Sequence, residues 1–76
     1  MAYTLHRLTV GSHDILLNGK IIGSLVSSSA RPGTWTAELL TENYPLPSPF
    51  MQVEHTFQRF EDVLEWLGSP EVKDRH

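Results

Sequence analysis

The sequence predicts a small α+β domain, an antiparallel sheet of three to four strands with one C-terminal helix packed on one face. Three observations lead to this class. Several short segments alternate apolar and polar residues, as half-buried strands do. An Asn-Gly pair separates two apolar runs, and one stretch near the C-terminus repeats apolar residues at helical spacing. We expect a single domain over residues 1–70 and a flexible tail at 71–76.

The first half of the chain predicts a strand followed by a hairpin. Residues 3–10, YTLHRLTV, are rich in β-branched and aromatic residues and alternate in part, which favours a strand. Asn18-Gly19 fits a type I′ turn, because both residues tolerate the positive φ that this turn needs. A two-residue loop sets the register, which pairs Leu17 with Lys20, Leu16 with Ile21, and Ile15 with Ile22.

This hairpin is apolar on both faces. By alternation, one face holds Leu16, Ile21 and Leu25, and the other holds Ile15, Leu17, Ile22 and Val26. Gly23 interrupts the second arm, which indicates either a bulge or the close approach of another backbone or ring. A single amphipathic helix covers only one face of such a sheet. The other face is then covered either by the Pro-rich linker or a curled strand, or by a second copy of the protein.

The next three segments are two strands and the linker between them. Residues 34–41 alternate, with Trp35, Ala37 and Leu39 on one side, which predicts a half-buried strand. Residues 42–50 carry three prolines, so they form an extended linker. Residues 51–57 alternate again and predict another strand, on which His55 is a half-buried, hydrogen-bonded residue.

The last element is a short amphipathic helix. Its apolar stripe is spaced at i, i+3, i+4 and i+7, on Phe60, Val63, Leu64 and Leu67. Acidic residues occupy the first turn, where the helix dipole favours negative charge. Gly68 fits the position that follows a helix C-cap, and Pro70 prevents the helix from continuing.

Composition limits the possible functions and locations. The 76 residues include no cysteine, which excludes disulfides and cysteine-ligated zinc. No signal peptide and no apolar run of roughly 20 residues is present, so we expect a soluble, cytoplasmic protein. Nine acidic residues against six basic ones give a net charge of −3, which disfavours non-specific binding to nucleic acid.

No motif for catalysis, metal binding or cofactor binding stands out. The four histidines show no metal-ligand spacing, and Ser27, Ser28 and Ser29 lack the context of a nucleophile. The glycines never assemble into a phosphate-binding loop. We therefore predict that the protein is not an enzyme and needs no cofactor.

The function that we predict is a non-catalytic binding or assembly module, which acts on a protein partner or on a second copy as a homodimer. The hydrophobic and aromatic residues near the hairpin, the Pro-rich segment and the helix form the candidate interaction surface. These residues are Leu16, Ile21, Leu25, Trp35, Tyr44, Phe50 and Trp66.

Parts of the second half of the chain resemble a known module. The aromatic strand WTAELL, the sequence HTF and an acid-rich helix ending in Trp-Leu are similar to the Arm-type, AP2-like N-terminal domain of tyrosine recombinases. The likeness covers about half the chain and is carried by Trp35, Phe57, Val63, Trp66 and Leu67. It implies a three-stranded sheet and one helix, with the sheet in the major groove of DNA. The chain is also similar to small bacterial proteins of unassigned function, which implies no activity.

A sheet-mediated nucleic-acid module is the alternative function. It requires Arg7, Lys20, Arg31 and Arg59 to converge on one face of the domain. The polar positions of the later strands are instead Thr34, Thr36, Glu38, Gln52 and Glu54, which lack the bases that read phosphates and guanine edges.

Overall fold

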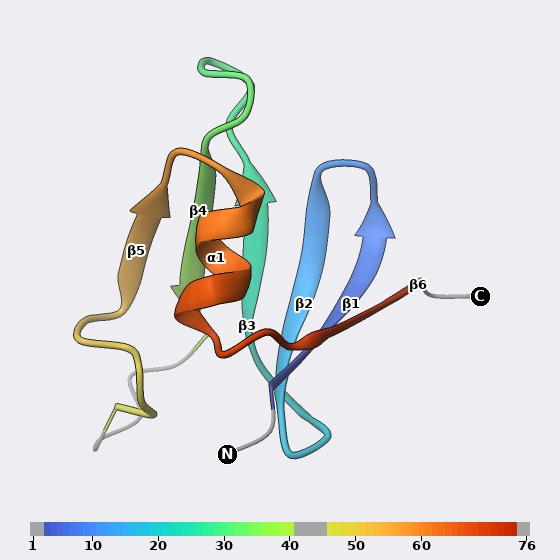
Figure 1. The fold of residues 1–76 in the computed structure, drawn as a ribbon, viewed down its shortest axis with the longest axis vertical. Coiled ribbons are helices and arrows are strands. Elements are labelled where there is room, and N and C mark those ends of the chain that lie inside the picture. The colour runs from blue at the N-terminus through green and yellow to red at the C-terminus, as the bar shows by residue number, and fades with distance from the viewer. Residues whose placement is uncertain (1–2, 41–45, 75–76) are drawn as a thin grey trace.

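A computed structural model describes residues 3–40 and 46–74 as one mixed sheet with one helix on it (Figure 1). The strands are β1 (Tyr3–Thr9), β2 (Ser12–Leu17), β3 (Lys20–Ser27), β4 (Trp35–Leu39), β5 (Glu54–Phe57) and β6 (Glu71–Asp74), and the helix is α1 (Phe60–Trp66). The strand order across the sheet is β5-β4-β3-β2-β1-β6. Neighbouring strands are antiparallel except β1 and β6, which are parallel. The α+β class is confirmed, but the sheet has six strands in the described residues instead of three to four.

The β2–β3 hairpin has the predicted turn. Asn18 and Gly19 both have positive φ, 53° and 84°, as a type I′ turn requires. The register is as expected next to the turn and then shifts: Ile15 pairs with Gly23, so Ile22 is an extra residue on β3. The predicted pair of Ile15 with Ile22 is therefore wrong, because this bulge moves the rest of β3 by one position. The predicted faces are wrong for the same reason: Leu25 lies on the face of Ile15, and Val26 lies on the face of Leu16 and Ile21.

The segment expected to be a flexible tail contains a strand. Glu71–Asp74 pair in parallel with residues 4–7 of β1, and Arg7 forms an exposed ion pair with Asp74 at 3.6 Å. All four residues of β6 are exposed, so the strand contributes little to the core. Its pairing satisfies backbone groups along the β1 edge, which would otherwise remain open.

The helix ends where its sequence predicts. Gly68 has φ of 81°, and its N–H bonds to the carbonyl of Glu65, while the N–H of Ser69 bonds to that of Leu64. These bonds close the last turn in the way of a glycine C-cap. At the other end, Arg59 forms an ion pair with Asp62 at 2.9 Å.

The core lies between α1 and one face of the sheet. Its buried members come from the strands, the helix and the Pro-rich segment: Tyr3, Leu5, Ile15, Leu25, Ala37, Leu39, Phe50, Val63 and Leu67. Phe50 belongs to this same cluster, so the described part of the Pro-rich segment covers the helix side of the sheet. It does not fold over the opposite face, which was one of the two expectations for that face.

Candidate functional site

The six described residues of the predicted interaction surface do not gather on one surface. Leu16, Leu25 and Phe50 are buried, and Leu25 retains no exposed surface. Trp35 and Trp66 are half-buried, and Tyr44 lies outside the described residues. Among the six described members, Ile21 has the largest exposed fraction, 48%. Ile21 and Leu25 were expected on the same face, but the extra residue Ile22 reverses the alternation along β3, so they lie on opposite faces of the sheet.

Trp66 docks the end of α1 onto β5 and the Pro-rich segment. Its ring centroid lies 4.7 Å from that of Phe50, 4.8 Å from that of His55 and 4.8 Å from that of Phe57. These tilted and edge-on geometries are the ones that aromatic pairs prefer in a packed interior. The position of Trp66 is therefore explained by packing.

His55 holds the chain between the Pro-rich segment and β5. Its Nε2 accepts hydrogen bonds from the backbone N–H groups of Met51, at 3.1 Å, and Gln52, at 3.3 Å. The expectation of a half-buried, hydrogen-bonded histidine is confirmed. Because Nε2 acts as the acceptor, the proton of the neutral ring lies on Nδ1.

A second histidine, His13, is buried between the rings of Trp35 and Phe60. It is 4% exposed, and its ring centroid lies 5.6 Å from Trp35 and 5.2 Å from Phe60. Its Nδ1 is buried and has no hydrogen-bond partner among the described residues. Burial lowers the pKa of His13, the nearby Arg7 lowers it further, and Asp74 acts in the opposite direction. A neutral imidazole in this position packs as an aromatic ring.

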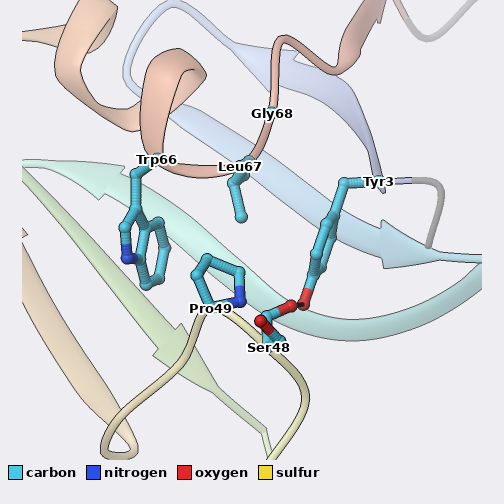
Figure 2. A pocket seen from close by; sticks show the side chains of 6 residues that line it. All are labelled: Tyr3, Ser48, Pro49, Trp66, Leu67 and Gly68. Atoms are coloured by element: carbon cyan, nitrogen blue, oxygen red, sulfur yellow. Dashed lines mark hydrogen bonds between the residues drawn. The ribbon is translucent and has the colours of Figure 1, made fainter.

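A shallow pocket of about 370 Å³ opens beside the C-terminal end of α1 (Figure 2). The rings of Trp66 and Tyr3 stand on either side of Pro49 and Leu67, and Ser48 and Gly68 complete the lining. The Tyr3 hydroxyl donates a hydrogen bond of 2.7 Å to the Ser48 carbonyl. Burial raises the pKa of Tyr3, so this hydroxyl stays a donor at neutral pH. The lining offers apolar contact and contains no carboxylate, imidazole or amine.

The face of the sheet opposite α1 carries the other notable surface, which we name the open face. It exposes Ile21 and Val26, at 48% and 45%, and no described helix or loop contributes a core residue on that side. The strand registers place one residue from each strand in a continuous row across it. From β6 to β5 this charged row is Lys73, His6, Asp14, Ser24, Glu38 and Glu54.

The two ends of the charged row differ in chemistry, with bases at one end and acids at the other. Its β6 end carries Lys73 and His6, and its β5 end carries Glu38 directly opposite Glu54. Like charges in opposed positions of an antiparallel pair repel each other. No ion pair joins either glutamate to a base in the described part of the chain. Sequence reasoning missed this row, because it depends on the pairing of β1 with β6.

The basic residues required by the nucleic-acid alternative lie apart. Lys20 follows the β2–β3 turn and Arg31 lies in the β3–β4 loop, so the two are at opposite ends of β3 (Figure 1). Arg7 and Arg59 are each paired with a carboxylate. No basic patch is thus formed by these four residues.

Residues 3–40 and 46–74 contain no group of three or more His, Cys, Asp or Glu side chains arranged to hold a metal ion. Within the same residues, no helix has the length and apolar character needed to cross a membrane. The resemblance to the N-terminal domain of tyrosine recombinases stays a sequence-based prediction. Comparison with protein-family models, curated proteins and solved structures finds no match for this chain.

Proposed function

We propose that the protein is a non-catalytic protein-binding or assembly module and that the open face is its binding surface. The observation that carries this proposal is the contrast in coverage. The helix and the Pro-rich segment pack on the same side of the sheet, while Ile21 and Val26 remain half-exposed on the other side. Apolar residues set among polar ones on an uncovered face are typical of protein contacts.

The pocket beside Trp66 is a weaker candidate for function. Its single ionisable group, the Tyr3 hydroxyl, is already bonded to Ser48 within the chain. A pocket without a free acid, base or nucleophile supports binding rather than catalysis. The cysteine-free composition supports a reducing compartment, and we place the protein in the cytoplasm.

The alternative, binding of nucleic acid through the sheet, has little support from the open face. Asp14, Glu38 and Glu54 place three carboxylates there, and these would repel a phosphate backbone. A gel shift at low salt checks this directly, and we expect no complex.

The proposal is tested with two variants of the full-length protein. Ile21→Glu combined with Val26→Glu places two charges on the open face, whereas Met51→Glu adds one charge of the same sign at a side chain that is 83% exposed elsewhere. Cross-linking and affinity capture from extract of the source cells should recover either a protein partner or the protein itself with wild type and with Met51→Glu. The double variant should lose that contact.

If both variants capture the partner equally well, the binding surface does not lie on the open face. Failure of wild type to contact any protein, itself included, would contradict the binding function altogether. Circular dichroism of each variant shows whether it is folded, so a loss of contact is read only from folded protein.

A further inference from the structure

The charged row of the open face is complementary to itself. Counting inwards from its two ends, Lys73 has Glu54 as its counterpart, His6 has Glu38, and Asp14 has Ser24. A base is thus matched with an acid in the first two pairs, and a carboxylate with a hydroxyl in the third. The midpoint of the row falls between β2 and β3, which are the two central strands of the sheet.

We infer that the partner of the open face is a second copy of this chain, packed face to face about a two-fold axis that runs parallel to the strands between β2 and β3. Such an axis reverses the order of the strands across the interface and keeps positions along them. It therefore sets Lys73 of each copy against Glu54 of the other, His6 against Glu38, and Asp14 against Ser24. The inference rests on the proposed function, because it names the partner of that surface.

The same axis also matches the apolar positions. Leu16 on β2 and Ile21 on β3 are register partners on the open face. Exchange of the two central strands places Ile21 of one copy, which is 48% exposed, over the position of the buried Leu16 in the other, so the exposed surface of Ile21 is covered in both copies. A two-fold axis across the strands would instead set Glu54 against Glu54, which is unfavourable.

Side-chain length along the row fits two twisted sheets in contact. The short residues Asp14 and Ser24 lie at the centre, and the long residues Lys73 and Glu54 lie at the ends. Face-to-face sheets keep their strands within about 30° of each other, and twist separates them toward the edges. Long side chains at the edges reach across the wider gap.

Three charged residues of the row already make two local interactions that the dimer would change. Lys73 contacts Glu71 of its own strand at 3.3 Å, an exposed pair that contributes little and can exchange partners. Glu38 and Glu54 repel each other within one copy. A second copy brings Lys73 to Glu54 and the His6 imidazole, which carries an N–H donor, to Glu38, so both glutamates gain a favourable contact.

Charge reversal in the full chain tests this arrangement, with sedimentation equilibrium over a micromolar to near-millimolar series at low salt. We expect a reversible monomer–dimer equilibrium for wild type. Glu54→Lys and Lys73→Glu should each raise the dimer Kd by roughly tenfold, because each substitution reverses two symmetric contacts. The double variant E54K/K73E should recover a Kd within about threefold of wild type, because the swapped charges again attract each other.

Matched controls carry the same charge changes off the open face. Glu61→Lys on α1 and Lys20→Glu beside the β2–β3 turn should leave the Kd within about twofold of wild type. Thermal unfolding confirms that each variant is folded.

A monomer at all concentrations, or a dimer whose double variant is not rescued, would overturn the inference. If wild type is monomeric but still captures another protein through Ile21 and Val26, the proposed function stands and only the second-copy partner is excluded.

Discussion

On β3, Leu25 and Val26 are neighbours in sequence but lie in different environments. Leu25 points into the core, where it pairs with Ala37 and has no exposed surface. Val26 points to the open face, where it pairs with Thr36 and is 45% exposed. The same backbone thus presents a tightly packed apolar surface on one side and a mixed, charged surface on the other.

The two faces of the sheet differ in which property of a side chain matters most. On the covered face, α1 and Phe50 fill the space above the strands, so the volume of each side chain matters. On the open face, the side chains meet solvent or a partner, so charge and position matter more than volume. Substitutions should therefore have large effects on folding from the first face and small ones from the second.

Truncation of one residue on each face of β3 gives the largest expected contrast. Leu25→Ala removes three carbons from a sealed position and should lower the free energy of unfolding by about 2–5 kcal/mol. Ile21→Ala, at a side chain that is half-exposed on the other face, should lower it by about 1 kcal/mol or less. Urea denaturation of dilute, monomeric protein measures both values. Similar losses in the two variants would mean that the open face is packed as tightly as the covered one.

Gly23 is the position where β3 changes its register, and it provides a second contrast. A Cβ at this glycine would lie 2.5 Å from the carbonyl oxygen of Glu38 and 3.3 Å from Cα of Leu39, both backbone atoms of β4. Gly23→Ala should therefore push β3 away from β4 and lower the free energy of unfolding by about 1–3 kcal/mol, as measured by urea denaturation.

Gly11→Ala is the control for this substitution. Its Cβ would lie 2.5 Å from Oγ of Ser27, the mobile end of a side chain that can rotate away. We expect a loss of less than about 1 kcal/mol. Equal losses at Gly11 and Gly23 would indicate that strand β4 yields without difficulty, and that close approach is not the reason for glycine at position 23.

Features set by local chemistry could be predicted from the sequence. Asn18-Gly19 and Gly68 each adopt the positive φ that their residue types suggested, so the hairpin turn and the end of the helix were both found. The alternation that placed Trp35, Ala37 and Leu39 on one side is likewise confirmed by their packing on the core. These features depend on a few consecutive residues.

Features set by distant pairing could not be predicted. Residues 71–74 have no apolar periodicity, and they form β6 because β1 offers an edge with open hydrogen-bonding groups. Gly23 was expected to mark a bulge or a close approach, and both are present, but which residue is extra depends on the pairing of β2 with β3, where it is Ile22. The charged row could not be predicted either, because it depends on the pairing of six strands. Its first member, Lys73, lies in the segment that was expected to be a tail.

The smallest expected effect concerns His13, which occupies the covered face although it is polar. His13→Phe keeps an aromatic ring between Trp35 and Phe60 and removes a buried Nδ1 that has no partner among the described residues. An unpaired buried polar atom is unfavourable, so the variant should be more stable by about 1 kcal/mol at neutral pH. Urea denaturation at about pH 7.5 and about pH 5.5 measures this value and its pH dependence.

The pH dependence has a definite sign. Because burial lowers the pKa of His13 in the folded chain, the unfolded chain binds this proton more readily as pH falls below about 6.5. Wild type should therefore lose stability between neutral pH and the lowered pKa, and His13→Phe should lose less. His13→Asn is the matched control, since it removes the titration but keeps a buried polar group; its pH dependence should match that of His13→Phe while its stability at neutral pH falls below wild type. If His13→Phe is less stable than wild type at neutral pH, the imidazole is satisfied in solution and the covered face tolerates a polar group at that position.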